Sequence, residues 1–165
     1  MLLAEPGKLL VSYVPYQGTL PPAVERGLKD GPIPLPEGTT KADAQASFNR
    51  LVDYVAALRD AGVPVLAGTD GAGPELVHEL ELYVRGGMTT AEALASATIV
   101  AARNVKADRR TGSIAVGKEA DLLLVNGDPE RNIGDLRHVD MVVLDGALLD
   151  GDALRKEAGF NGRPK

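Results

Sequence analysis

The sequence predicts an α/β protein, and three local patterns support this fold class. Residues 40–62 combine apolar positions at helical spacing with a final glycine, and the short apolar run 63–67 follows at once. Residues 73–101 repeat the helical pattern, and the chain beyond residue 109 changes to short apolar runs between turns. The 165 residues suit one ordinary domain. They fall short of the roughly 250 residues that a complete (β/α)8 barrel needs.

The first part of the chain is predicted to be a short strand followed by an irregular connection. Residues 8–14, with the sequence KLLVSYV, are rich in the β-branched and aromatic residues that strands favour. Residues 15–38 contain more than half of the prolines and several glycines. Long irregular connections in compact domains are usually functional or mobile.

A helix is predicted to begin near Thr40 and to end at Gly62. Thr40 and Asp43 have the spacing of a capping box, and glycine suits the position just after a helix end. The next residues, Val63 to Ala67, predict a buried strand. The predicted packing face of the helix consists of Phe48, Leu51, Val52, Val55 and Leu58.

Two further helices are predicted after this strand. Gly73-Pro74 opens the first, because proline fits the first turn of a helix, and Gly86-Gly87 ends it. Thr89 and Glu92 form a second capping box ahead of the next helix. The predicted buried faces are Leu76, Val77, Leu80, Tyr83 and Val84 in the first helix, and Leu94, Ala97, Val100 and Ala101 in the second.

From about Arg109 onward the sequence predicts strands. The dipeptide Asp145-Gly146 between two apolar runs is typical of a β-hairpin. The segment after Gly151 is polar and is predicted to fray. The predicted strands cover residues 114–116, 120–125 and 141–149, the last interrupted by the hairpin turn.

Composition and charge exclude several classes of protein. The formal net charge of -5, without a cluster of Lys or Arg, argues against nucleic-acid binding. The absence of cysteine excludes disulfides and thiolate metal sites. No apolar run is long enough for a transmembrane helix, so no membrane partner is expected, and the first residues lack the basic start of a signal peptide. The compartment stays unassigned, with the cytoplasm as the default.

Asp70 is the leading candidate for chemistry because it directly follows the predicted strand 63–67. Barrel enzymes of the α/β class place their ligands and bases at the C-terminal ends of strands. Gly68 and Gly71 flank Asp70 and allow a sharp turn and the close approach of a ligand. An aspartate at this place also suits a plain turn or a helix cap. The local pattern leaves both interpretations open.

The other candidate residues have simpler explanations. His78 lies early in the helix after Asp70 and could reach the same face, although a partly exposed helix histidine is the plainer interpretation. His138 lies in a charged turn, where a structural role is favoured. The glutamates of the helix that carries His78 are expected to form its solvated face: Glu75, Glu79 and Glu81.

Several familiar site motifs are absent from the sequence. It contains no H-x-H, no H-E-x-x-H and no Cys/His cluster, so no complete zinc site can be assembled at a recognisable spacing. The glycines at 71–73 are not followed by Lys-Ser/Thr and do not form a phosphate loop. A G-x-S-x-G nucleophile elbow is also absent.

Three segments in a fixed order carry a family resemblance: GVPVLAGTD (62–70), HELELYVRGGMTTAEALASAT (78–98) and GSIAVGKEADLLLVNGDP (112–129). This order resembles the C-terminal part of the amidohydrolase superfamily, closest to imidazolonepropionases and Xaa-Pro dipeptidase-like enzymes. The resemblance implies the C-terminal part of a metal-dependent hydrolase (β/α)8 barrel plus strands of a small β-sandwich subdomain. Residues 1–108 would then be terminal βα units of an incomplete barrel, 109–151 subdomain strands, and 152–165 a tail.

The resemblance also implies roles for individual residues. Asp70 would be a metal ligand and the catalytic base that takes a proton from metal-bound water and later delivers it to the leaving amine. His78 and Gly71 would contact the substrate or the residues around the metal. The metal would be divalent, zinc by resemblance, and would be present only in the complete enzyme. A divalent metal lowers the pKa of bound water toward about 7, and a carboxylate can accept its proton.

Two departures from the family pattern limit what this chain can do. The family's H-x-H, its bridging lysine or glutamate and its two later histidines have no match here, and TIVAAR (98–103) stands where members often read T-x-N-P-A-R. We therefore expect part of an amidohydrolase that acts on an amide, cyclic amide or dipeptide bond and is inactive as an isolated chain. Its partners would be a small-molecule substrate and either a second copy or a missing N-terminal part. The alternative is a non-catalytic interaction or scaffold protein that retains the barrel end.

Overall fold

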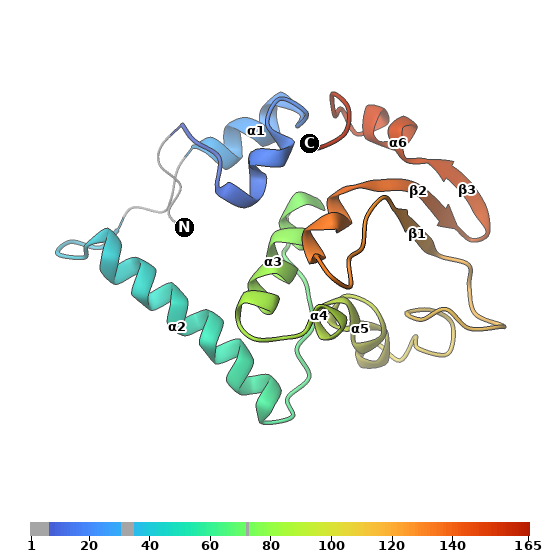
Figure 1. Cartoon of the computed structure of the whole chain (residues 1–165), viewed down its shortest axis with the longest axis horizontal. Coiled ribbons are helices and arrows are strands. Elements are labelled where there is room, and N and C mark those ends of the chain that lie inside the picture. The colour runs from blue at the N-terminus through green and yellow to red at the C-terminus, as the bar shows by residue number, and fades with distance from the viewer. Residues whose placement is uncertain (1–6, 31–34, 72) are drawn as a thin grey trace.

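The computed structural model describes residues 7–30, 35–71 and 73–165. Helices and one small sheet at one side of the molecule make up the structure, which confirms the α/β class (Figure 1). None of the helices in these ranges is long and apolar enough to cross a membrane. The elements are η1 (Val11–Tyr16), α1 (Pro22–Lys29), α2 (Lys41–Asp60), α3 (Gly73–Arg85), α4 (Thr90–Ser96), α5 (Ile99–Asn104), β1 (Leu122–Val125), η2 (Ile133–Arg137), β2 (Val139–Leu144), β3 (Ala147–Asp150) and α6 (Gly151–Glu157), where η denotes a 3-10 helix.

The sheet is antiparallel and has the strand order β1-β2-β3. Leu123 pairs with Val142 across β1 and β2, and Leu144 pairs with Ala147 next to the turn that joins β2 and β3. The predicted hairpin at Asp145-Gly146 is confirmed. Both turn residues have positive φ, 49° and 79°, as a tight two-residue hairpin turn requires.

Both predicted capping boxes are confirmed. The Asp43 N–H donates to Thr40 Oγ1 at 3.2 Å, and the Thr40 N–H donates to the Asp43 carboxylate at 3.0 Å. Thr89 and Glu92 exchange the same two bonds at 3.1 and 2.7 Å. Gly62 follows the end of α2 with a φ of 76°, as predicted.

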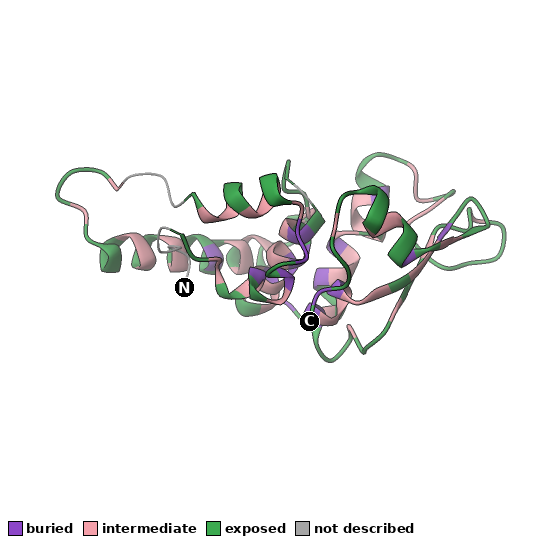
Figure 2. Ribbon diagram, turned by 90° about the horizontal axis from the view of Figure 1, so that it is seen from above, coloured by how far each residue is buried: buried purple, intermediate pink, exposed green. Residues whose placement is uncertain are grey.

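The hydrophobic core lies where α3 meets α4, η2 and the extended residues before Asp70. In Figure 2 the buried residues gather near the middle of the molecule, whereas α2 is largely exposed. The predicted packing face of α2 is correct except at one position: Val52 is buried and Val55 packs against the core, but Leu51 is 63% exposed. The other two predicted members, Phe48 and Leu58, are half-buried. Among the described residues α2 packs chiefly against α3, which covers only one side of it. The core cluster consists of Leu80, Tyr83, Met88, Ala93 and Ile133.

The prediction for the N-terminal segment is wrong in two places. The strand predicted at 8–14 is replaced by η1, in which Tyr13 and Tyr16 are buried. Their i, i+3 spacing places both rings on one side of a 3-10 helix, which a strand would not do. The connection predicted as irregular over 15–38 contains α1, which starts at Pro22 because proline is tolerated in a first helical turn.

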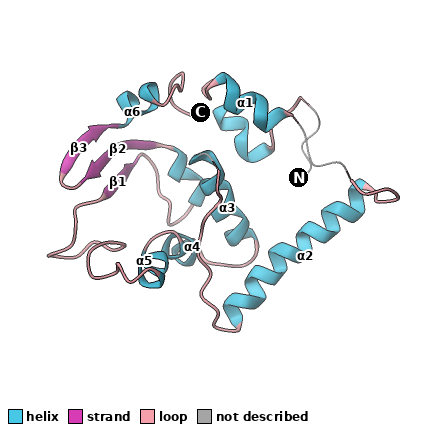
Figure 3. Cartoon of the chain, turned by 180° about the vertical axis from the view of Figure 1, so that it is seen from behind, coloured by secondary structure: helices cyan, strands magenta, loops and turns pink. Residues whose placement is uncertain are grey.

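Two predicted strands do not form ladders among the described residues. Residues 63–67 are extended but have no strand partner, and Val63 is 47% exposed (Figure 3). Residues 114–116 belong to a loop in which Ile114 is 88% exposed. Lys118 Nζ closes this loop by donating to Thr111 O at 3.2 Å and Ser113 Oγ at 2.7 Å. A strand needs a neighbour for its backbone groups, and the described residues supply none at either place.

The helix predicted after Thr89 is divided into α4 and α5. The break lies at Thr98, whose φ and ψ of -128° and -98° are not helical. Thr98 Oγ1 donates to Leu94 O at 2.7 Å, a carbonyl that also accepts from the Ala97 N–H at 3.2 Å, so the side chain of Thr98 caps the end of α4.

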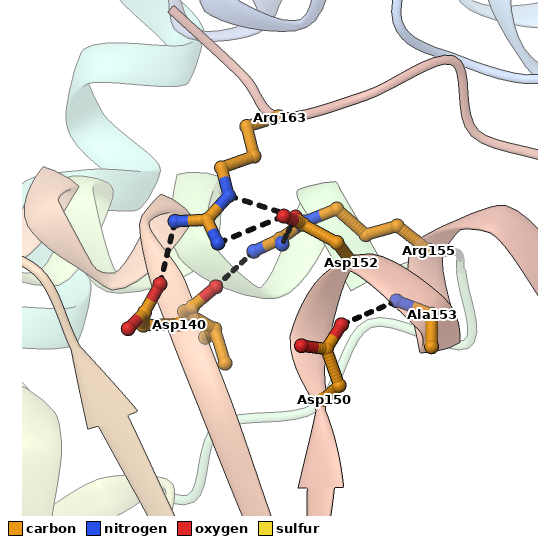
Figure 4. Close-up of polar contacts among 7 residues, drawn as sticks. Asp140, Asp150, Asp152, Ala153, Arg155 and Arg163 are labelled. Carbon is orange, nitrogen blue, oxygen red and sulfur yellow. Dashed lines mark hydrogen bonds and ion pairs between the residues drawn. The ribbon is translucent and has the colours of Figure 1, made fainter.

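The segment after β3 is ordered by a helix and by ion pairs, so the predicted fraying is wrong. Asp150 caps α6 by accepting from the Ala153 N–H at 2.8 Å. Arg163 reaches back to Asp140 at 2.6 Å and to both oxygens of Asp152 at 2.7 and 2.8 Å (Figure 4). The end of the chain lies beside η1, where the Lys165 N–H donates to a backbone carbonyl at 2.8 Å.

Candidate functional site

Asp70 lies exposed in the turn between the extended residues 63–69 and α3. Its φ of 52° is in the left-handed region, where aspartate is one of the few non-glycine residues found with any frequency. Within the described residues, no hydrogen bond or ion pair of its carboxylate is present. Asp70 is therefore exposed to solvent, and its predicted role stays a prediction.

Gly71 allows the turn to pack closely against the first turn of α3. A Cβ placed on Gly71 would come within 1.6 Å of Glu75 Oε2, so any larger residue would displace that carboxylate. The Gly71 N–H donates to Thr69 Oγ1 at 3.3 Å. These contacts give Gly71 a packing role, and its predicted contact with substrate stays a prediction.

Two side chains of α3 hold the extended residues before Asp70. Glu79 Oε2 accepts a hydrogen bond from the Gly68 N–H at 2.8 Å. The buried Tyr83 hydroxyl donates to Glu79 Oε1 at 2.7 Å and lies 3.2 Å from Leu66 O. Burial, followed by the Glu79 carboxylate, raises the pKa of Tyr83, so its hydroxyl keeps its proton and remains a donor. On the other side, the Ala67 N–H donates to a carbonyl at the end of α4 at 3.2 Å.

Glu79 and Tyr83 together form a clamp on the residues before Asp70. His78 faces away from this clamp, toward η1. Its ring meets the Tyr13 ring edge-on, with centroids 5.4 Å apart and an interplanar angle of 65°. Nδ1 is buried, has no hydrogen-bond partner in the described part of the chain, and lies 3.7 Å from Glu81 Oε2. His78 and Ser12 also line an open cavity of about 470 Å³. These neighbours belong to η1 and α3, and the predicted contact of His78 with substrate stays a prediction.

A buried ion pair lies at the same cavity and connects three elements. The Arg137 side chain, only 6% exposed, donates to Glu81 Oε1 and Oε2 at 2.7 and 2.8 Å. It also donates to Ser12 O at 3.0 Å and to Gly134 O at 3.2 Å. Its guanidinium carbon lies 5.9 Å from the Tyr16 ring centroid. Arg137 therefore joins η1, α3 and η2 through one side chain.

The electrostatics of this pair depend on a balance between burial and hydrogen bonding. Burial alone would raise the pKa of Glu81, but its polar neighbours His78 and Arg137 outweigh it and lower the pKa to about 2. Burial also raises the pKa of Tyr13 to about 12, with Glu75 adding to the effect. Glu81 is thus ionised and both tyrosines of η1 are neutral near neutral pH.

The prediction that Glu79 and Glu81 form a solvated face is wrong. Both are half-buried, and each holds a different part of the molecule. A signal for Glu81 was present in the sequence: it stands four residues after Val77 and three before Val84, on the buried stripe of the helix. No local pattern identified its partner Arg137, which lies 56 residues further along the chain.

The residues present here do not make a metal centre by themselves. Among the described residues no group of three or more His, Cys, Asp or Glu side chains is close enough to hold a metal ion. Zinc sites in proteins use three or four such ligands. Asp70 is a suitable single ligand, but His78 lies against Tyr13 and Glu81 on the side of α3 that faces η1. His138 lies far along the chain, directly before β2.

Comparisons with known proteins agree with the sequence motifs. A Mycobacterium tuberculosis protein of uncharacterized activity is 43% identical over 113 residues, which are 66% of this chain and 29% of that protein. The imidazolonepropionase of Geobacillus kaustophilus is 36% identical over 104 residues, 58% of this chain and 24% of that enzyme. A crystal structure of a Xaa-Pro dipeptidase with bound methionine in its active site superposes with a TM-score of 0.60 at 32% identity, covering 67% of this chain and 28% of the dipeptidase.

These relatives are much longer than the present chain, which spans 24% to 29% of their length. The family model described as the amidohydrolase family matches residues 42–149, more than half of the chain. The matched range contains the Asp70 turn, the clamp formed by Glu79 and the buried ion pair. The chain therefore belongs to the amidohydrolase family.

Proposed function

We propose that this chain is the C-terminal portion of a metal-dependent amidohydrolase that hydrolyses a small amide, a cyclic amide or a dipeptide. Asp70 is its contribution to the active site, as a metal ligand and a proton acceptor. The proposed metal is zinc, held with ligands that the complete enzyme supplies from elsewhere. The proposed architecture is the end of a (β/α)8 barrel over 1–108, with the strands of 109–151 in a β-sandwich and the remainder as a tail.

One observation carries this proposal: Asp70 lies exposed at the end of an extended segment inside the matched family range, and its carboxylate has no partner among the described residues. A left-handed φ at a non-glycine residue costs free energy and persists where the surroundings impose it, often at functional sites. The likeness to a Xaa-Pro dipeptidase and an imidazolonepropionase supports C–N bonds of small molecules as the target. His78 and Gly71 remain proposed contacts of the substrate or of the residues around the metal.

A fusion tests this proposal. The whole chain is joined behind the part of a Xaa-Pro dipeptidase that precedes the matched region, and Xaa-Pro hydrolysis is measured. We expect hydrolysis by the fusion and a loss of at least about a hundredfold in kcat on Asp70→Asn, as for removal of a general base. Asp53→Asn, an exposed aspartate on α2, is the matched control and should leave kcat unchanged. An Asp70→Asn fusion as active as its parent would contradict the proposal.

A second candidate, a non-catalytic interaction protein, is favoured by the apolar side chains that this chain leaves exposed. Ile114 is 88% exposed, Leu148 on β3 is 70% exposed, and Leu123 on the edge strand β1 is 59% exposed. Exposed apolar edge strands are sites where other chains pair. This candidate predicts tight binding of a partner protein without any dependence on metal or on Asp70.

A further inference from the structure

We propose that Glu79 is a positioning residue for Asp70 and acts through the backbone of Gly68. The inference rests on the proposed function, because the position of Asp70 matters to chemistry only if its carboxylate takes part. Glu79 touches neither Asp70 nor the cavity beside His78 in any contact of the described residues. Its effect on the site would be indirect.

The extended residues before Asp70 need hydrogen-bond partners from outside their own segment. Backbone N–H and C=O groups require partners, and a strand ordinarily finds them in its neighbours. Residues 63–69 have no strand neighbour in the described part of the chain, and one backbone bond, from Ala67 to Ser96 at 3.2 Å, ties them to α4. The backbone groups of Leu66 and Gly68, on either side of Ala67, are bonded instead by side chains of α3.

Glu79 suits the role because its two oxygens are used separately. Oε2 accepts from Gly68, two residues before Asp70, in a charge-assisted bond of 2.8 Å. Oε1 accepts from the hydroxyl of Tyr83, a residue only 8% exposed, which fixes the glutamate side chain against the core. The direction in which the chain enters the turn at Asp70 is thereby tied to the rigid helix α3.

Amide hydrogen exchange of the full chain, followed by NMR, tests the proposal without using activity. We expect the Gly68 amide of Glu79→Ala to exchange roughly tenfold to a hundredfold faster than in the parent, because a bond to a charged acceptor is lost. Glu79→Gln retains one acceptor oxygen and should restore much of the protection. Glu157→Gln, at the exposed end of α6, removes the same charge and should leave the Gly68 rate unchanged.

The amide of Leu80 in the core distinguishes positioning from general stabilisation. The proposal requires its exchange rate to stay constant while Gly68 exchanges faster. An unchanged Gly68 rate in Glu79→Ala, or an equal acceleration at Gly68 and Leu80, overturns it. Because the measurement uses no substrate or metal, its failure is distinct from failure of the hydrolase proposal, which the fusion with Asp70→Asn tests.

Discussion

Replacing Arg137 by methionine is expected to lower the free energy of unfolding by about 3 kcal/mol, because it removes the buried partner of an ion pair and leaves the half-buried Glu81 charged. Glu81 would keep its carboxylate but lose both bonds to the guanidinium, and Ser12 and Gly134 would lose a donor. Single domains are stable by about 5–15 kcal/mol, so this loss is large. Urea unfolding followed by circular dichroism measures it.

Two further arginine variants give this prediction its controls. Arg137→Lys keeps the positive charge but cannot bind both carboxylate oxygens in a planar fork, and an intermediate loss is expected. Arg163→Met removes an exposed arginine whose pairs with Asp140 and Asp152 lie at the surface. Exposed pairs contribute little, so its loss should be far smaller. Equal losses for Arg137→Met and Arg163→Met would contradict the structural role of Arg137.

The second large effect is a loss of stability in acid that depends on Glu81. Its carboxyl has a pKa of about 2 in the folded chain against an ordinary value of 4.5, so the folded state binds the proton more weakly than the unfolded state. The stabilisation is present in full above the unfolded pKa and is lost as the pH falls from there through about 2. The difference between the two pKa values corresponds to about 3 kcal/mol.

The comparison with Glu81→Gln isolates this contribution, because several other carboxyls also have lowered pKa values, among them Asp43 and Glu92. Unfolding free energies of both proteins are measured in urea from about pH 7 down to about pH 2. The parent should be the more stable protein at neutral pH, and the two curves should converge in acid. Parallel curves over the whole range would show that Glu81 does not titrate as the structure indicates.

The parts of the fold that were predicted correctly are determined by residues close in sequence. The Thr40 and Thr89 caps each depend on a carboxylate three residues later, and the β2–β3 hairpin depends on Asp145-Gly146. These bonds join residues that are close in sequence, so the residue types at these positions are enough to predict them. The glycine at 62 ends α2 for the same reason.

The errors concern interactions between distant segments. Residues 63–67 have the composition of a buried strand, but whether a ladder forms depends on neighbours that no local pattern reveals. α6 and the following residues are held by Arg163 on Asp140, 23 residues away, and a polar composition alone predicts fraying. The partners of Glu79 and Glu81 likewise come from other segments, Gly68 and Arg137.

For the candidate site, the sequence predicts Asp70, and its role stays a prediction, whereas the residues that hold its segment are visible only in the structure. The motif order around Asp70 identified the family, which the match over residues 42–149 confirms. The clamp of Glu79 and Tyr83 was missed because Tyr83 was assigned to the core and Glu79 to solvent. Helical spacing separates the buried face of α3 from its polar face. It does not show that these two side chains bind each other and the segment beside them.

The most direct test of this account is the zinc content and turnover of the isolated chain. The chain is incubated with zinc, dialysed against metal-free buffer, and examined by elemental analysis and by hydrolysis of a Xaa-Pro dipeptide. Since the described residues hold no three-ligand group, we predict far less than one zinc per chain and no turnover. One tightly bound zinc per chain, with turnover that Asp70→Asn abolishes, would contradict the proposal that the chain supplies only part of the site.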